Sequence, residues 1–246
     1  MNLDTPIAQG NTAKIYRCED QIIKVFHDYF PQEEAINEAA KQEAARVSGL
    51  PVPRIIDVTT IDGNPAIIMA YIKGKTLGDL LLENRHKADY YMGISVDIQL
   101  KIHEICLNTI EPMAKKLKRQ IQLASKLNEI QKTNLLNQLD HMKFDARLCH
   151  GDFHLFNVIM SDNRVFVIDW VDSSVGDIRA DVCRTYLLYS QQYEELAELY
   201  LNLYCKKSGI SKGEIMEWAP IIAGARLSEI VLTEDQGRLL KIVQGD

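Results

Sequence analysis

The pattern of hydrophobic and polar positions changes along the chain, from short β-prone runs to long helical periods. Each of the early runs, at residues 13–26 and 53–72, contains a turn and therefore predicts two strands. Between them, a stretch rich in Ala, Glu and Lys predicts a helix over residues 32–48 that ends at Gly49. Residues 1–72 are therefore expected to form a small antiparallel sheet with one helix.

The first hairpin places a lysine at a definite position. A turn that pairs Cys18 with Gln21 sets Ile15 opposite Lys24. The small polar residues before this hairpin, around Gly10, would then form a loop beyond the end of the sheet, near that lysine.

Helical periodicity dominates the rest of the chain, residues 73–246. Thr76, with Asp79 three residues later, predicts the start of the first helix. Residues 178–240 are again helical in pattern, whereas residues 148–170 are extended. We therefore expect a larger, mainly helical part with a β-hairpin set into it.

Composition limits the class of protein. The chain has 246 residues, of which 46% are hydrophobic and 25% charged, as in soluble globular proteins. The net charge of −6 disfavours a nucleic-acid partner. A basic stretch at 114–126 is interpreted as a solvated helix face. The sequence shows neither a membrane-spanning apolar run nor a signal peptide, so we expect no membrane partner and a cytoplasmic location.

The five cysteines are widely spaced and include no C-x-x-C pair. This spacing favours neither a disulfide framework nor a thiolate zinc site. The cysteines are interpreted as small buried hydrophobic residues.

The most informative segment is LCHGDFHLFNVIMSDNRVFVIDWVDSSVGD, residues 148–177. Two apolar strands flank a turn, and pairing of Met160 with Val165 brings Asn157 and Asp169 beside each other at the open end of the hairpin. An amide oxygen and a carboxylate suit magnesium, which keeps several waters and takes its remaining oxygens from phosphates. The segment therefore predicts a magnesium site.

Asp152 lies in a short loop, five residues before Asn157. Phosphoryl-transfer enzymes use this D-x-x-x-x-N spacing to bring a base and a metal ligand to one point. A carboxylate near its ordinary pKa of about 3.9 is ionised at neutral pH and can orient an attacking hydroxyl. Asp152 is therefore predicted to be the catalytic base.

Together these residues resemble a known group of enzymes. HGDFHLFNVIM followed by VFVIDW is similar to the catalytic and metal-binding segments of the aminoglycoside phosphotransferase and choline kinase group, small-molecule kinases with the protein-kinase-like fold. QIIKVF around Lys24, Glu38 before SGLPVP, and the connector IIMAYIKGKTL follow that group in order and approximate spacing, so the resemblance covers residues 7–190. It implies a two-lobed α+β fold, with residues 1–72 as the nucleotide-binding lobe and residues 73–246 as the catalytic and substrate-binding lobe.

The resemblance also implies roles for single residues. Lys24, paired with Glu38, would bind the α- and β-phosphates of the nucleotide. Glu33, Glu34 and Glu43 lie on the same predicted helix and are alternative partners for the lysine. The other implied nucleotide contacts are adenine packing on Met69, backbone hydrogen bonds at Ala70 and Ile72, and phosphate-binding amides in the loop through Gly10 and Asn11.

The implied activity is transfer of the γ-phosphoryl group of ATP, or alternatively GTP, to a hydroxyl of a small molecule, with Mg²⁺ as cofactor. The chain has one glycine in its phosphate loop, HGD in place of HRD, and DWV in place of DFG, which favours a small acceptor over a protein. Aminoglycoside-, choline- and sugar-like acceptors all stay open. Six aspartates against two arginines in residues 150–182 favour a cationic acceptor.

Two alternative functions stay open. A catalytically silent pseudokinase would bind nucleotide without turnover. The presence of all four residues expected of an active enzyme counts against it: Lys24, Asp152, Asn157 and Asp169. The H-x-D-x-H pattern of His150, Asp152 and His154 could instead bind zinc or iron in a metal-dependent hydrolase. Asp172 is a further candidate for a metal contact, besides its interpretation as a loop residue.

Overall fold

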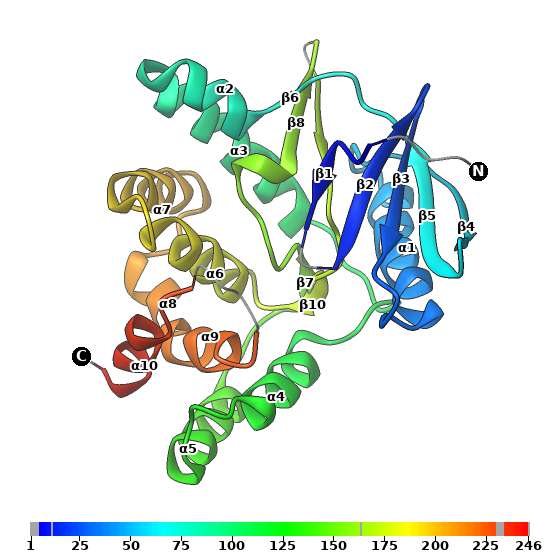
Figure 1. Cartoon of the computed structure of the whole chain (residues 1–246). Helices are drawn as coiled ribbons and strands as arrows, with labels where there is room; N and C mark the ends of the chain where they lie inside the picture. The colour runs from blue at the N-terminus through cyan, green and yellow to red at the C-terminus, as the bar shows by residue number, and fades with distance from the viewer. Residues whose placement is uncertain (1–4, 11, 163, 230–233, 246) are drawn as a thin grey trace. The chain divides into compact units, whose positions relative to one another are not determined.

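The computed structural model describes most of the chain (Figure 1). The described ranges are 5–10, 12–162, 164–229 and 234–245. Asn11, which was predicted to contact the nucleotide phosphates, lies outside them. None of the helices within these ranges is both long enough and apolar enough to cross a bilayer.

The described residues fall into two compact units. Unit 1 comprises those up to Leu80 together with Phe156–Val171, and unit 2 comprises Leu81–Leu155 and those from Asp172 onward. The chain therefore enters unit 1 a second time within the segment predicted to be catalytic. The domain boundary after residue 72 stays a prediction.

Unit 1 contains a five-stranded antiparallel sheet in the order β1-β2-β3-β5-β4 (Figure 1). Its strands are β1 (Ala8–Gln9), β2 (Ala13–Cys18), β3 (Gln21–Phe26), β4 (Ile55–Ile61) and β5 (Asn64–Ala70). The predicted hairpin register is confirmed, because Cys18 pairs with Gln21 and Ile15 with Lys24. Part of the loop predicted before this hairpin is instead the short strand β1, which pairs with β2.

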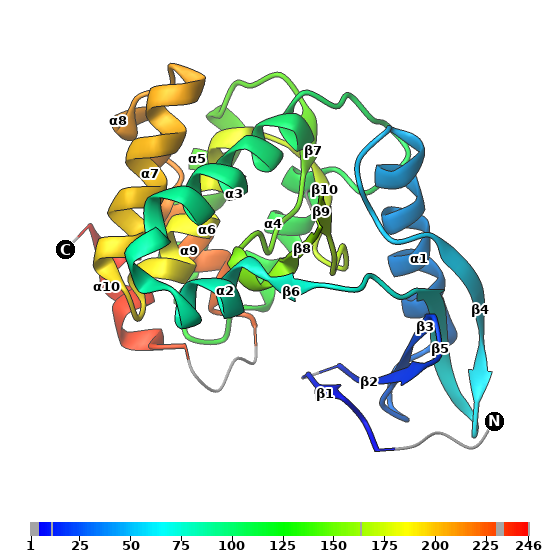
Figure 2. The same ribbon diagram turned by 90° about the horizontal axis from the view of Figure 1, so that it is seen from above.

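One helix, α1 (Gln32–Val47), packs against this sheet as predicted (Figure 2). Ala35 and Ala39 on α1 lie in one buried cluster with Phe26 of β3. Their short side chains allow a close approach of helix and strands while keeping high helix propensity. Gly49 follows the helix with a φ of 89°, a left-handed conformation that suits glycine.

A second sheet of unit 1 has the order β6-β8-β9. Its strands are β6 (Lys75–Thr76), β8 (Val158–Ser161) and β9 (Arg164–Val167). The predicted pairing of Met160 with Val165 is confirmed. The amide of Ile168 also donates to the carbonyl of Asn157 at 3.0 Å, so the hairpin ladder extends to the residues that the sequence placed at its open end.

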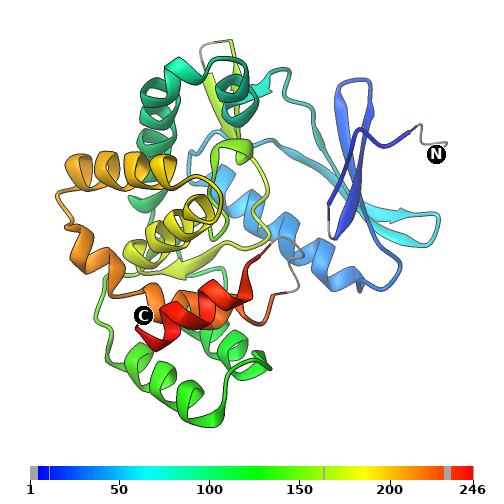
Figure 3. The same ribbon diagram turned by 60° about the vertical axis from the view of Figure 1, so that its left-hand side comes forward.

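Unit 2 is mainly helical, as predicted. The helices of the larger part of the chain are α2 (Leu77–Glu83), α3 (Ala88–His103), α4 (Met113–Leu123), α5 (Glu129–His141), α6 (Ile178–Ser190), α7 (Glu194–Ser208), α8 (Lys212–Met216), α9 (Ala219–Arg226) and α10 (Gln236–Gln244), with 3₁₀ turns at Arg85–Lys87 and Leu155–Asn157. The Thr76 hydroxyl accepts the Asp79 amide at 3.0 Å, which confirms the predicted start of α2. Helix α9 packs against α4, α6 and α10, and Figures 1 and 3 both show α10 beside α9.

Two short strands, β7 (Arg147–Cys149) and β10 (Ser174–Gly176), pair within unit 2. Cys149 and Cys183 are buried, as predicted. The prediction is wrong for Cys18 and Cys106, which are exposed because one lies beside a hairpin turn and the other in the loop after α3. All five cysteines are free thiols.

Candidate active site

Lys24 is a buried lysine in the middle of β3. Its ammonium nitrogen Nζ lies 2.6 Å from Oε1 of Glu38 on α1. Side chains alternate along a strand, and Lys24 shares the α1 face with Phe26, two residues away. The structure therefore pairs Lys24 with Glu38, whereas Glu43 forms a two-point contact with Arg46.

Opposing effects set the ionisation of this pair. Burial lowers the pKa of Lys24, but the charges of Glu38 and Asp169 outweigh burial and leave that pKa above its ordinary value. Burial raises the pKa of Glu38, and the charge of Lys24 offsets only part of this increase. A lysine ammonium has three donors, and among the described residues Glu38 and Asp169 accept two of them. One donor is left for an anionic ligand.

Asp169 directs its carboxylate toward Lys24. Its Oδ1 atom lies 3.4 Å from the lysine Nζ, and 41% of its side chain is exposed. The backbone of Asp169 has a φ of 62°, in the left-handed region that few residues other than glycine adopt. This conformation turns the chain sharply after β9, so three separate segments of unit 1 bring Lys24, Glu38 and Asp169 into one cluster.

Asn157 is buried in the same unit, at the end of the 3₁₀ turn before β8. The hydrogen bond from Ile168 to its carbonyl places Asn157 next to the residue that precedes Asp169. The predicted adjacency of Asn157 and the end of β9 is therefore present. Amide and carboxylate oxygens are donors that magnesium accepts together with water and phosphate oxygens, so these residues fit the predicted ion.

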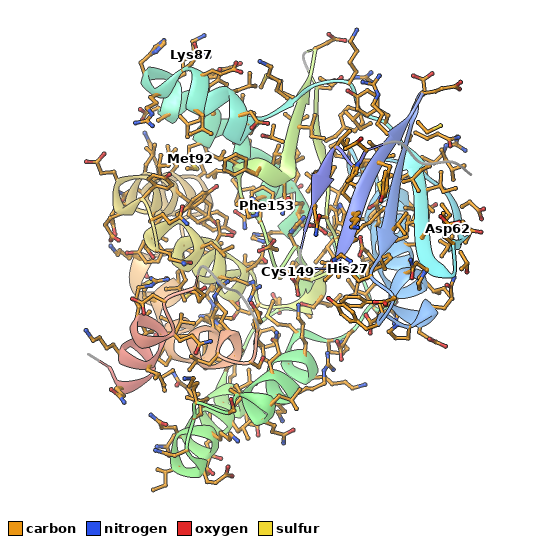
Figure 4. The ribbon with its side chains drawn as sticks, in the orientation of Figure 1. His27, Asp62, Lys87, Met92, Cys149 and Phe153 are labelled. Atoms are coloured by element: carbon orange, nitrogen blue, oxygen red, sulfur yellow. The ribbon has the colours of Figure 1, made fainter. Side chains whose placement is uncertain are left out.

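The predicted base, Asp152, lies in the loop after β7 in unit 2. Gly151 before it has a φ of 82°, and a Cβ atom there would lie 2.3 Å from the carbonyl oxygen of Asp172. The Gly151 amide donates to Asp181 Oδ1 at 2.7 Å. Only glycine therefore fits at this position. Figure 4 labels Cys149 and Phe153, the residues on either side of this loop.

The surroundings of Asp152 keep its carboxylate ionised. Burial raises its pKa, but the close contact with His154 and the charge of Arg184 outweigh burial and hold the pKa well below its ordinary value. His154 Nε2 lies 3.6 Å from Asp152 Oδ2. A carboxylate with so low a pKa is a weak base. Its main contribution to catalysis would therefore be to orient the hydroxyl of the acceptor.

The zinc or iron site of the hydrolase alternative is not formed. His150 is fully buried, and its Nδ1 accepts the Asp152 amide at 3.3 Å, so the ring supports the loop. Across the ranges that the structure describes, no group of three or more His, Cys, Asp or Glu side chains could hold a metal. The magnesium site predicted at Asn157 and Asp169 is not of this kind, since it would rely on water and phosphate for further ligands.

A buried network behind the loop was not predicted from the sequence. Asp181 Oδ2 accepts from Gln99 Nε2 at 3.1 Å and contacts His103 Nε2 at 3.0 Å, while its other oxygen holds Gly151. The Nδ1 atom of His103 lies 2.7 Å from the hydroxyl of Tyr204. Burial raises the pKa of Asp181, but these contacts outweigh burial and lower it to about 2.

Lys116 and Arg184 are the second group that sequence analysis missed. Lys116 lies in the basic stretch predicted to be solvated, but its Nζ contacts Asp172 Oδ1 at 2.5 Å and the Asp172 carbonyl at 2.7 Å. Arg184 on α6 donates to both carboxylate oxygens of Glu229, at 2.8 and 3.2 Å. The sequence contains one signal for Arg184: it is a charged residue among the apolar positions of the helix α6. Such a position indicates a buried charge with a partner.

The remaining predicted nucleotide residues lie in unit 1. Met69 and Ala70 end β5, and the Ala70 amide donates at 2.9 Å to the carbonyl of the residue before β4. Ile72 follows in an extended, half-buried stretch. Gly10 is exposed in the turn between β1 and β2, where its amide donates to the Ala13 carbonyl at 2.9 Å. The nucleotide contacts of these residues stay predictions.

Comparisons with known proteins confirm the resemblance. The model of a family described as "Phosphotransferase enzyme family" matches residues 5–218. Acyl-CoA dehydrogenase family member 10 of Mus musculus is 27% identical over 204 residues, which cover 66% of this chain and 19% of that protein. A probable serine/threonine-protein kinase of Clostridium perfringens is 30% identical over 103 residues, 38% of this chain and 15% of that protein. The chain thus spans less than a fifth of either relative.

Solved structures confirm the predicted protein-kinase-like fold. A thermostable mutant of aminoglycoside phosphotransferase APH(4)-Ia, in a ternary complex with ADP and hygromycin B, has a TM-score of 0.72 at 13% identity, over 99% of this chain and 93% of that one. A choline/ethanolamine kinase family protein from Mesorhizobium loti has a TM-score of 0.66 at 14% identity, over 99% and 87%. ADP-bound APH(2'')-Ib has a TM-score of 0.64 at 18% identity, over 100% and 92%.

Proposed function

Because the chain belongs to the phosphotransferase enzyme family, we propose that it transfers the γ-phosphoryl group of ATP to a hydroxyl group of a small molecule. The observation that carries this proposal is the cluster of Lys24, Glu38 and Asp169, in which the described residues accept two of the three lysine donors and leave one for a phosphate. Solved relatives that hold ADP or AMP-PNP support ATP over GTP. The relative that holds ADP together with hygromycin B supports a small acceptor.

In this proposal the residues of unit 1 hold the nucleotide. Lys24, fixed by Glu38, donates to the nucleotide phosphates, while Asn157 and Asp169 are the protein ligands of Mg²⁺. When bound, Mg²⁺ would neutralise charge on the transferring phosphoryl group. Met69, Ala70 and Ile72 would face the adenine, as the family resemblance implies.

Asp152 in unit 2 acts on the acceptor. Its ionised carboxylate accepts a hydrogen bond from the acceptor hydroxyl, orients the oxygen for in-line attack, and takes the proton as the new bond forms. Asp152 lies five residues before Asn157, and an extended chain of that length spans at most about 17 Å. The connection alone therefore limits how far the base can lie from the metal ligand.

The test is ATP consumption with a panel of hydroxylated acceptors, followed by the variant Asp152→Asn. We expect Asp152→Asn to lower turnover by about 10² to 10⁴, the usual contribution of a general base, with nucleotide affinity unchanged. Asp145→Asn, at an exposed position of the same unit, is the matched control. Turnover of Asp152→Asn near that of the control would remove the proposed role, and ATP binding without transfer to any acceptor would favour a pseudokinase.

A further inference from the structure

Among the residues that the structure describes, three arginines of unit 2 have guanidinium donors without hydrogen-bond partners. They are Arg184 on α6, Arg226 on α9 and Arg238 on α10, and the unpartnered atoms are Nε of each, with Nη1 of Arg226 in addition. Only 2% of the Arg226 side chain is exposed. A buried donor without a partner destabilises the fold, so these arginines favour the binding of an acceptor group.

Two acidic residues lie around these arginines, and among the described residues one of their oxygens, Oε1 of Glu234, has no hydrogen-bond partner. Glu229 accepts both terminal nitrogens of Arg184, and Gln120 donates to it at 3.1 Å. Glu234 accepts from Arg226, and its second oxygen lies 3.6 Å from Arg238 in an ion pair. Within the described part of this cluster, the hydrogen-bonding capacity that remains therefore lies mainly on guanidinium N–H groups.

Arg184 belongs to the surroundings of the Asp152 loop. Gly151 packs on the carbonyl of Asp172, and the Asp172 carboxylate lies 3.9 Å from Arg184. Gly151, Asp172 and Arg184 line one cavity of about 20 Å³ in unit 2, which has room for about one water molecule. Ala225 also lines this cavity, and Arg226 is the next residue in the sequence.

The charge of Arg184 also acts on Arg226. Burial and the charge of Arg184 lower the pKa of Arg226 to about 10. The charge of Asp152 raises this pKa in part, as does that of Glu229. An anion bound between the two arginines would relieve their mutual repulsion and occupy the free donors.

Three of the six aspartates that favoured a cationic acceptor in the sequence have partners inside unit 2. Asp172 is held by Lys116, and Asp177 by the guanidinium and amide of Arg179. Asp181 holds Gly151 and contacts His103, as described above. The negative charges of these three aspartates are therefore largely neutralised by partners inside unit 2, which leaves little of that charge to attract a cationic ligand.

We propose that Arg184 and Arg226 bind an oxyanion of the acceptor, a carboxylate or a phosphate carried near the hydroxyl that Asp152 orients. This inference rests on the proposed phosphotransferase function and specifies the chemical class of its acceptor. The oxyanion would accept hydrogen bonds from Nε of Arg184 and from Nε and Nη1 of Arg226, the donors without partners among the described residues. These bonds would also fix the distance between the anionic group and the reacting hydroxyl.

A binding test separates this inference from the activity. The thermal midpoint is measured in sodium sulfate and in sodium chloride at equal ionic strength, for the wild type, Arg184→Gln, Arg226→Lys and Lys24→Met. We expect sulfate to raise the midpoint above that in chloride by more for the wild type and for Lys24→Met, which lacks the proposed nucleotide phosphate contact, than for Arg184→Gln. In Arg184→Gln only the general stabilising effect of sulfate should remain. If Arg184→Gln does not fold, Arg226→Lys gives the comparison, since it keeps the positive charge and loses the Nε and Nη1 donors. An equal effect of both salts on the wild type, or a sulfate effect unchanged in the arginine variants, overturns the proposal.

A second test measures acceptor preference on one carbon skeleton with glycerol, serinol, glycerate and glycerol 3-phosphate. We expect kcat/KM for an anionic member to exceed that for glycerol at least tenfold and for cationic serinol to be lowest. Glycerate against glycerol 3-phosphate distinguishes carboxylate from phosphate. Arg184→Gln should remove the preference, whereas Arg85→Gln, at an exposed position of unit 2, should keep it. Preference for serinol, or a preference unchanged in Arg184→Gln, overturns the inference. If no acceptor at all is phosphorylated, the proposed function fails while the sulfate result still decides the oxyanion site.

Discussion

Gly151 shows how strongly the catalytic loop depends on one backbone position. It has a left-handed φ of 82°, its amide holds Asp181, and it lies against the carbonyl of Asp172. A side chain at this position would clash with the backbone of Asp172. The backbone cannot move aside as easily as the end of a flexible side chain, so the clash would be costly in free energy. The next residue is Asp152, and any shift of Gly151 therefore moves the proposed base.

We expect Gly151→Ala to reduce turnover by at least about 100-fold and to lower the free energy of unfolding by more than about 2 kcal/mol, through left-handed strain and the 2.3 Å approach to Asp172. Gly209→Ala is the control, because Gly209 has a φ of 79° and a Cβ atom there would meet no other atom within 4 Å. It should cost only the strain of about 1 kcal/mol and keep normal turnover. The measurements are urea unfolding and initial rates, and equal losses in the two variants would contradict this account.

Asp169 combines a charge with an unusual backbone, and the variant Asp169→Asn separates the two. Asparagine also tolerates the left-handed region, so the fold after β9 should persist while the carboxylate is lost. We expect the Mg²⁺ concentration for half-maximal ATP binding to rise about tenfold or more, since a charged ligand of a hard cation is removed. Titration calorimetry at varied Mg²⁺ measures this shift. Asp162→Asn, with a φ of 46° in the β8–β9 turn, should leave the dependence unchanged, and a normal dependence in Asp169→Asn would exclude the assigned role.

At the scale of elements, the sequence predicts most where a short-range rule fixes the geometry. The turn that joins β2 to β3 sets the register that places Ile15 opposite Lys24, and the β8–β9 turn does the same for Met160 and Val165. Asp181 could not be assigned its role in this way, because its partners Gln99 and His103 come from α3, about 80 residues away in the chain. Contacts of this kind depend on how helices pack, which no local period encodes.

Helix α1 illustrates how packing sets a site residue. Ala39 is 6% exposed against the sheet, next to Glu38 in sequence. We expect Ala39→Leu to overpack this interface, lower the free energy of unfolding by about 1 to 3 kcal/mol, and raise the KM for ATP as Glu38 shifts from Lys24. Ala40→Leu, at the exposed neighbouring position, should leave both unchanged. Denaturant unfolding and steady-state kinetics test this, and an unchanged KM in Ala39→Leu would show that the Lys24 contact does not depend on this packing.

At the scale of the whole molecule, the net charge of −6 says little about the acceptor, because the decisive charges are paired internally. Asp172, Asp177 and Asp181 each have a partner within unit 2. From the sequence, the excess of six aspartates over two arginines in residues 150–182 indicated a cationic ligand. The family, the fold class and the lysine–glutamate pairing follow from local segments, whereas the acceptor side depends on Arg184 and Arg226, whose surroundings only the folded helices define.

This internal pairing also predicts how stability depends on pH. The pKa of Asp181 is lowered from 3.8 to about 2 in the folded chain, and those of Asp152 and Asp172 are lowered as well. A carboxyl whose folded pKa is depressed stabilises the fold fully above its unfolded pKa of about 4, and this stabilisation is lost as the pH falls through the folded pKa. Glu38, whose pKa is raised, acts in the opposite direction.

We therefore expect the free energy of unfolding to fall between about pH 5 and pH 2. Asp181→Asn should make that fall smaller by about 2 kcal/mol and should lower stability at pH 7. Urea unfolding at a series of pH values measures both effects, with the exposed Asp89→Asn as control. A pH dependence as steep in Asp181→Asn as in the wild type would mean that the contacts of Asp181 with Gly151 and His103 do not contribute to the acid limb of stability.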